Sequence, residues 1–148
     1  MTTTAPLADG RVIGLAHYAS RAVLEHVLAP YDIGFTQLVT LRLVTVADGS
    51  VERDALVDGV VGTVKIGASE AQGSIDGLIT AGLLTPEAPS RMRITDAGRN
   101  LYAKASAEGA AVADRLYAGI SEEDRAVAGR VLTLVTERAN AELATLGS

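Results

Sequence analysis

Long segments near both ends of this 148-residue chain repeat apolar residues at helical spacing, and they constrain the fold more than any other feature. The first runs from residue 10 to about 28 and follows Asp9, a typical N-cap. Two more run from about 96 to 117 and, after the N-cap Ser121, from about 122 to 143. One small chain cannot cover so many apolar helix faces, and closed two-fold dimers are the commonest solution. The sequence therefore predicts a homodimer held together by its chain ends.

Aliphatic side chains must fill the core of this protein, because 48% of its residues are hydrophobic and only 3% are aromatic. This composition argues against global disorder and favours packed helices over an aromatic-rich β-sandwich. The formal net charge of −5 provides no overall attraction to nucleic acid or to anionic lipid. Any binding to such a polyanion therefore depends on a local patch of basic residues.

Several classes of protein are disfavoured by what the sequence lacks. It has no cysteine, which excludes disulfides and thiolate metal sites. The N-terminus lacks the basic and apolar regions of a signal peptide, and no run of about 18 apolar residues predicts a membrane span. No phosphate-binding loop or catalytic constellation stands out. We therefore expect a cytoplasmic protein that is not an enzyme, uses no cofactor or metal and does not bind membranes.

Capping and breaking residues divide the middle of the chain into short elements. Thr36 and Ser50 are predicted as N-caps of the second and third helices, and Gly82 as the residue that follows the fourth. Two extended pieces around a loop with two prolines predict a β-hairpin, and Thr95 is predicted to cap the next helix. The three middle helices are predicted over residues 37–47, 51–61 and 69–81, and the hairpin strands over 83–85 and 91–94.

The order of these elements places a compact unit between the two chain ends. Residues 1–8 show no pattern and are predicted to form a flexible tail. The compact unit covers residues 50–95, and the dimerisation helices cover residues 9–49 and 96–148. The predicted fold class is therefore mainly α with a small β-hairpin.

Four stretches of the chain resemble, in order, the MarR family of bacterial transcriptional regulators, which are dimeric winged helix-turn-helix proteins. "LAPYDIGFTQLVTLRLV" resembles the junction between the first two helices of that family, and "IDGLITAGLL" resembles the end of its recognition helix and the start of its wing. "RITDAGRNLY" matches the Thr-x-x-Gly pattern after the wing through Thr95 and Gly98. "YAGISEEDRAVAGRVL" is similar to the turn between the fifth and sixth helices. Together the resemblance spans about residues 11–143.

The resemblance implies a particular architecture and function. Residues 50–95 would be a winged helix-turn-helix unit that binds double-stranded DNA, and the terminal helices would join two copies on a pseudo-palindromic operator. Small anionic or phenolic effectors often alter DNA binding in this family. His17 and Tyr18 are then candidates for lining a ligand cavity, or else lie at a subunit contact. Arg42 is a candidate partner of an anionic ligand, or else forms a salt bridge on a solvated face.

The candidate DNA contacts lie on the fourth helix and on the hairpin. Basic side chains at Lys65, Arg91 and Arg93 would bind phosphates, and Arg91 and Arg93 lie two apart on a strand and so point to the same side. Together the three would form one cluster in each subunit. Gly73 lets the backbone of the helix approach DNA closely, or else lets a neighbouring helix pack closely. The residues expected to face the bases are Ser69, Gln72 and Ser74.

Charge around the candidate DNA contacts departs from the family pattern and leaves a second function open. The chain has no Lys or Arg between residues 66 and 90, and residues 50–104 carry six basic and seven acidic side chains. Phosphate neutralisation supplies much of the affinity for DNA, so this balance is unfavourable. The alternative prediction is a winged-helix dimer that binds a small molecule or a protein partner with little or no DNA binding.

Overall fold

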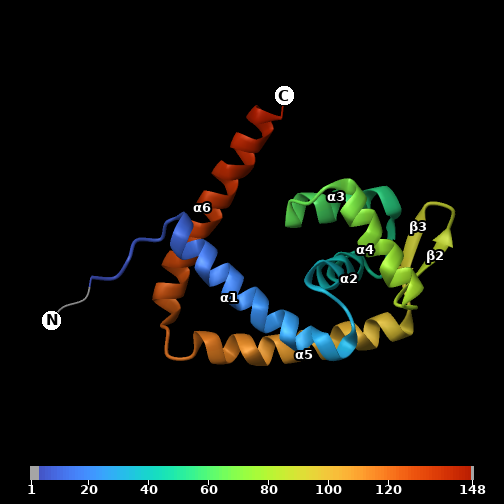
Figure 1. The fold of residues 1–148 in the computed structure, drawn as a ribbon, viewed down its shortest axis with the longest axis horizontal. Helices are drawn as coiled ribbons and strands as arrows, with labels where there is room; N and C mark the ends of the chain where they lie inside the picture. The colour runs from blue at the N-terminus through green and yellow to red at the C-terminus, as the bar shows by residue number, and fades with distance from the viewer. Residues whose placement is uncertain (1–3, 148) are drawn as a thin grey trace. The chain divides into compact units, whose positions relative to one another are not determined.

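A computed structural model describes residues 4–147, and within this range six α-helices, one short 3-10 helix and three β-strands follow one another (Figure 1). The fold class, mainly α with a small β-sheet, is confirmed. The chain divides into two compact units, of which the first ends at Ala110 and the second begins at Ala111. In chain order the elements are α1 (Gly10–Leu28), η1 (Ala29–Tyr31), α2 (Phe35–Val46), β1 (Ser50–Glu52), α3 (Arg53–Val64), α4 (Ala68–Thr80), β2 (Leu84–Ala88), β3 (Arg91–Ile94), α5 (Asp96–Tyr117) and α6 (Glu122–Leu146).

Local capping signals place the starts of the long helices correctly, whereas α6 ends at Leu146, later than predicted. The Val12 N–H donates to Asp9 Oδ1 (3.0 Å) at the start of α1. The Gly98 N–H donates to Thr95 Oγ1 (3.0 Å) at the start of α5, and α5 covers the predicted residues. At the start of α6 the Asp124 N–H donates to the Ser121 hydroxyl (3.1 Å). Each cap satisfies a backbone donor that has no partner inside its helix.

Two of the predicted N-caps, Thr36 and Ser50, are wrong. Helix α2 begins at Phe35, earlier than expected, with Gly34 as its N-cap, and Gln37 Oε1 accepts the Gly34 N–H (3.0 Å). Ser50 begins strand β1, and helix α3 starts only at Arg53. The preceding Asp48 and Gly49 have φ of 60° and 89°, so the chain turns sharply there and enters the sheet before it becomes helical.

The three strands form an antiparallel sheet in the order β1-β3-β2. In the register of this sheet Ser50 lies opposite Arg93, and Glu52 lies opposite Arg91. Side chains alternate along β3, so that Met92 and Ile94 are buried while Arg91 and Arg93 lie on the other face. The predicted hairpin is therefore present, and β1 adds a third strand on the side of β3 away from β2.

The core of the first unit is aliphatic and lies among α2, α3, α4 and the sheet. Helix α2 contacts α3, α4 and β3, and its residues Leu41 and Val44 are fully buried. The Tyr31 hydroxyl donates to Glu108 Oε1 (2.7 Å), which ties η1 to α5. Because α2 belongs to this core, its additional role among the dimerisation helices 9–49 stays a prediction, as does the role of residues 96–148.

The second unit consists of the end of α5 and all of α6. The Ile120 N–H donates to the Tyr117 carbonyl (3.1 Å), Gly119 between them has φ of 80°, and the Arg125 guanidinium lies 4.5 Å from the centre of the Tyr117 ring. Every residue of α6 is exposed. Its large apolar side chains are Val127, Val131, Leu132, Leu134, Val135, Leu143 and Leu146.

Three further observations concern residues 4–147 as a whole. None of the helices in this range is both long and apolar enough to cross a membrane. Among the same residues, no three His, Cys, Asp or Glu side chains lie together as a metal site requires. Of the predicted tail, residues 4–8 are exposed and outside regular secondary structure, while residues 1–3 lie outside the described residues.

Candidate nucleic-acid interface

Helix α4 buries one face against the core and presents a polar face to solvent. Its buried residues Ala71, Ile75 and Leu78 recur at helical spacing. Glu70 lies in the first turn and is exposed. The exposed face therefore offers small polar groups and two carboxylates, without a basic residue of its own. The exposed positions of α4 are Ala68, Ser69, Glu70, Gly73, Asp76 and Thr80.

The residues of α4 predicted to face bases do not all lie on that exposed face. Ser69 is exposed, and a Cβ atom built on Gly73 would have no other atom within 4 Å. Ser74 is buried, and its hydroxyl lies 3.1 Å from that of Thr40 on α2. It shares the buried face with Ile75, so the expectation that it faces bases is corrected here. Its hydroxyl instead links α4 to α2 inside the core.

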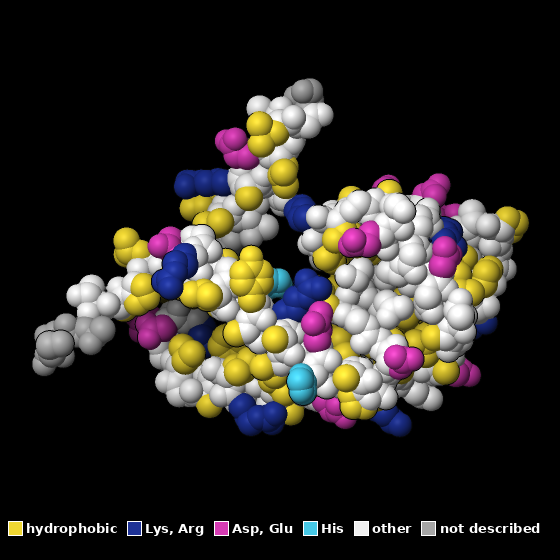
Figure 2. Space-filling view, viewed as in Figure 1, with side chains coloured by type: hydrophobic (Ala, Val, Ile, Leu, Met, Phe, Trp, Pro, Cys, Tyr) yellow, Lys and Arg dark blue, Asp and Glu magenta, His cyan; other side chains and the backbone are white. Residues whose placement is uncertain are grey.

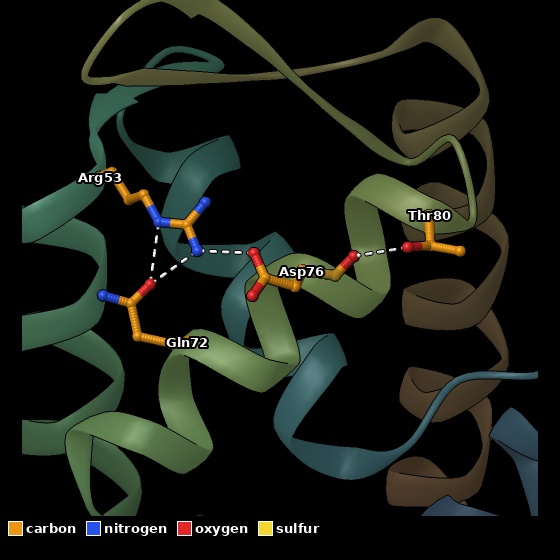
Figure 3. Close-up of polar contacts among 4 residues, drawn as sticks. All are labelled: Arg53, Gln72, Asp76 and Thr80. Atoms are coloured by element: carbon orange, nitrogen blue, oxygen red, sulfur yellow. Dashed lines mark hydrogen bonds and ion pairs between the residues drawn. The ribbon is translucent and has the colours of Figure 1, made fainter.

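Gln72 is half-buried and is held by Arg53, a residue that the sequence reasoning missed (Figure 3). Arg53 donates from Nε (2.9 Å) and Nη2 (2.6 Å) to Gln72 Oε1, and from Nη2 to Asp76 Oδ1 (2.6 Å). The sequence contained one signal of this role. A capping box that starts at Ser50 would have Glu or Gln at position 53, and the chain has arginine there instead. The arginine there is explained by its partners on α4, which are 19 and 23 residues away.

Arg91 lies on the hairpin of β2 and β3, called the wing below, and has two acidic neighbours. It donates from Nη1 to Glu52 Oε1 (3.1 Å) and from Nε to the Ser50 hydroxyl (3.1 Å), and its Nε lies 3.9 Å from Glu87 Oε2. The hydrogen bond with Ser90 and the neighbouring Arg91 lower the pKa of Glu52 from its ordinary value of 4.5. Two carboxylates therefore balance the one charge of Arg91, which reduces its attraction for a phosphate.

Arg93 and Lys65 are the two predicted phosphate contacts that keep their charge unbalanced. Both are exposed, and neither forms an ion pair within residues 4–147. Lys65 directly follows the C-terminal end of α3. At the N-terminal end of the same helix, the Arg53 backbone N–H donates to the Ser90 carbonyl of the wing (2.6 Å). A helix of 12 residues is about 18 Å long. Lys65 therefore does not form one cluster with Arg91 and Arg93, and the three would meet different phosphates.

The surface around α3, α4 and the wing is not a continuous basic field. Figure 2 shows basic and acidic side chains interspersed over this part of the molecule on the visible face. The sequence agrees, since residues 50–104 carry six basic and seven acidic side chains. Attraction to a polyanion therefore depends on the few exposed and unpaired cations rather than on net charge.

A hollow of about 340 Å³ lies among α1, α2 and α4. Arg21 lines it with its guanidinium 4.6 Å from the centre of the Phe35 ring, and Arg21 Nε donates to Glu25 Oε1 (3.1 Å). Glu70 and Ser74 contribute to its lining from α4. The hollow therefore combines a cation and an aromatic ring with two residues of the helix that carries the polar face.

The predicted ligand residues are placed unequally around this hollow. His17 lies edge-on to Phe35, with 6.3 Å between the ring centres, and 5.9 Å from the Tyr18 ring. Tyr18 is mostly exposed, and Arg42 is exposed on α2; neither is among the lining residues. The sequence reasoning missed Arg21 and Phe35. Two features of the sequence could have indicated them: Phe35 is the single phenylalanine of the chain, and Arg21 lies four residues after His17 and so on the same helix face.

Comparison with known proteins adds information about the fold. No protein-family model matches the sequence, and no curated protein matches it significantly. Similar solved structures include a MarR-family transcriptional regulator from Rhodococcus sp. RHA1, which is 20% identical with a TM-score of 0.73 over 90% of this chain and 96% of that one. CouR from Rhodococcus jostii RHA1, bound to p-coumaroyl-CoA, is 20% identical with a TM-score of 0.75 over 90% and 96%. A MarR protein from Peptoclostridium difficile DA00132 is 14% identical with a TM-score of 0.77 over 99% and 97%.

Proposed function

We propose that this chain, which has the winged-helix fold of the MarR-family regulators, is a transcriptional regulator that binds double-stranded DNA. The observation that carries the proposal is the exposed polar face of α4, followed directly by a wing that bears Arg93, which is exposed and forms no ion pair within residues 4–147. An α-helix fits the major groove, where small polar groups can contact base edges. Arg93 and Lys65 would bind phosphates, and in this proposal the protein acts in the cytoplasm as a homodimer on a pseudo-palindromic operator.

The homodimer is supported by helix α6. This helix has 25 residues, all of them exposed, and seven large apolar side chains. Leaving so much apolar surface in water is unfavourable, and burial stabilises by about 25 cal/mol per Å². A second copy would cover it, and a two-fold dimer presents two α4 helices to the two halves of a palindrome.

Modulation by a small ligand is supported by the hollow beside α4. Phe35 offers an aromatic face, and the guanidinium of Arg21 is already paired with Glu25, so within the proposed class of small anionic or phenolic effectors the hollow suits a phenolic compound better than an anion. CouR, one of the similar structures, is bound to p-coumaroyl-CoA. A ligand in this hollow would contact Glu70 and Ser74 of α4 and so shift the helix proposed to read DNA. His17 adjoins it through Phe35 and would help to orient that ring.

A second candidate function is supported by the pairing of the basic residues. Arg53 and Arg91, two of the arginines near α4 and the wing, are bound to carboxylates, and Glu70 and Asp76 are exposed on α4. A dimer with this surface would bind a small molecule or a protein partner and have little affinity for DNA.

Selection of bound sequences from random duplex DNA distinguishes the two candidates. The selected duplexes are then titrated by fluorescence anisotropy at about 0.15 M salt. The regulator is expected to select a two-fold sequence, and Lys65→Ala/Arg93→Ala is expected to weaken binding to every sequence and flatten its salt dependence. A folded dimer that selects no sequence would support the second candidate.

A further inference from the structure

We propose that Gln72 recognises bases only through the hydrogen-bond acceptors that they present in the major groove. Arg53 holds the Gln72 oxygen, so that only the amide NH₂ of Gln72 faces DNA. Gln72 would then select guanine or thymine, which present acceptors in the major groove, and disfavour adenine. This inference rests on the proposed DNA-binding function and specifies which bases one residue recognises.

The orientation of the Gln72 amide follows from the chemistry of its partner. A guanidinium has only donors, so the atom that faces it must be an acceptor. Both Arg53 Nε and Nη2 lie within hydrogen-bond distance of Gln72 Oε1, at 2.9 and 2.6 Å. The opposite orientation of the amide would place its NH₂ against two N–H donors. Arg53 therefore determines which end of the Gln72 amide is free.

Asp76 holds the guanidinium in this position from the next turn of α4. Its Oδ1 accepts from Arg53 Nη2 (2.6 Å), and Figure 3 shows the guanidinium between the Gln72 and Asp76 side chains. The Arg53 side chain is 27% exposed, so water only partly screens these contacts. Hydrogen bonds with a charged partner are roughly twice as strong as neutral ones. The Gln72 oxygen is therefore not readily released to a base.

The Gln72 nitrogen is free to donate. Within residues 4–147 it has no hydrogen-bond partner, and no buried side-chain nitrogen or oxygen there lacks one, so this nitrogen reaches solvent. Figure 3 shows it directed away from Arg53. The next residue, Gly73, has open space where a side chain would begin, so a base edge can approach closely.

The base preference follows from the groups that each base presents. Glutamine pairs fully with adenine by donating to N7 and accepting from N6 with its oxygen. With the oxygen bound to Arg53, the adenine N6 donor is left without a partner. Guanine presents two adjacent acceptors, N7 and O6, and thymine presents O4. A donor-only Gln72 is therefore expected to favour guanine or thymine over adenine by roughly fivefold or more.

The test compares base preferences selected from random duplexes by the full-length parent and three variants. The parent is expected to select guanine or thymine at one position of each half-site, and Gln72→Ala is expected to lose that preference alone. Arg53→Met removes the donors and frees the oxygen, so adenine should gain at the same position. Arg53→Lys keeps a donor against the oxygen and should retain the parent preference. Circular dichroism and solution mass establish that each variant is a folded dimer.

The other outcomes contradict the inference, and they differ in whether the proposed function is also contradicted. Adenine at the Gln72-dependent position of the parent, or no position that depends on Gln72, overturns the inference while the proposed function stands. An Arg53→Met variant that folds and keeps the parent preference overturns it as well. The parent and Gln72→Ala suffice for the test if Arg53→Met does not fold. A parent that selects no sequence at all overturns both the inference and the proposed function.

Discussion

Glycine in α4 has two candidate explanations, close packing against a neighbouring helix and close approach to DNA. The surroundings of Gly73 distinguish between them. A Cβ on Gly73 would meet no atom within 4 Å, so close packing against a neighbouring helix does not explain it. That explanation suits Gly77, where a Cβ would lie 2.8 Å from Gln37 Nε2, and the Gln37 side chain is itself held at the start of α2. In the proposed function, this open space would let DNA approach the helix closely.

Gly73→Ala is therefore expected to stabilise the protein and to weaken its binding to DNA. Alanine favours a helix interior over glycine by about 1 kcal/mol, and here it meets no steric obstacle. Unfolding in urea measures the first effect, and anisotropy with a selected duplex measures the second. Gly62→Ala in α3, which also has open space, is the control for stability alone. If Gly73→Ala is more stable and binds DNA as tightly as the parent, DNA does not approach the helix at this residue.

Gly98 is required for a different reason, because backbone atoms occupy the place of a side chain. A Cβ there would collide with the carbonyl oxygen of Leu83 and lie 2.8 Å from Ile94 Cγ1. We expect Gly98→Ala to lower the free energy of unfolding by about 1–3 kcal/mol, the usual range for overpacking. Gly129→Ala in α6 introduces the same methyl group without a contact within 4 Å and should not be destabilising. Equal stability of the two variants in urea would contradict the close contact at Gly98.

At the scale of elements, two carboxylates, Glu52 on β1 and Glu87 on β2, lie beside the single charge of Arg91 on β3. The Glu87 carboxylate lies 3.9 Å from Arg91 Nε and accepts the Ser50 hydroxyl hydrogen bond (2.6 Å). Glu87→Gln should release part of the Arg91 charge to bind phosphate. DNA binding is expected to strengthen, and the slope of log K against log salt to steepen by about 0.9 for each additional phosphate that the protein neutralises. Glu137→Gln in α6 makes the same change in net charge, and an equal increase in affinity from it would show that net charge alone is responsible.

The same wing is expected to loosen in acid. A hydrogen bond with Ser90 and, to a smaller extent, the contact with Arg91 lower the pKa of Glu52 below 4.5 in the folded protein. A lowered pKa means that the contribution of Glu52 to stability is present above pH 4.5 and is lost as the pH falls through the lowered value. Carboxyl titration by NMR should show the low pKa, and Ser90→Ala should move it upward. An unchanged Glu52 titration in Ser90→Ala would contradict this cause.

The elements differ in how far the sequence alone could predict them. Helix α5 and its cap at Thr95 were predictable, because a cap and a helical repeat are local signals. Strand β1 was not, because Ser50 and Val51 become a strand only by pairing with β3, about 40 residues later. The Arg53–Gln72 contact was hidden for the same reason: the partners are 19 residues apart and lie on two helices. The burial of Ser74 was predictable from helical spacing, because Ser74 lies three residues after Ala71 and four before Leu78, which are both buried.

At the scale of the whole molecule, the proposed function requires two copies, so that each presents α4 to one half of an operator. The apolar side chains of α6 lie on about half of the helix circumference when its residues are placed at 3.6 per turn. Leu132 and Val135 lie within this apolar half, whereas Thr133 and Asn140 lie on the opposite half. A second copy would therefore cover α6 on one side only.

Two charges placed in the apolar half of α6 should separate the copies without unfolding them. The parent is expected to show twice the 15.2 kDa mass of one chain in sedimentation equilibrium, and Leu132→Glu/Val135→Glu to show the single mass. Both side chains are exposed in one chain, at 41% and 44%, so the first unit should keep its helical circular dichroism. Thr133→Glu/Asn140→Glu adds the same charge to the opposite half and should leave the dimer intact. The separated copies should also lose binding to a two-fold duplex, because each would then hold only half of the site. A parent of single mass, or a dimer that survives Leu132→Glu/Val135→Glu, would contradict dimerisation through α6.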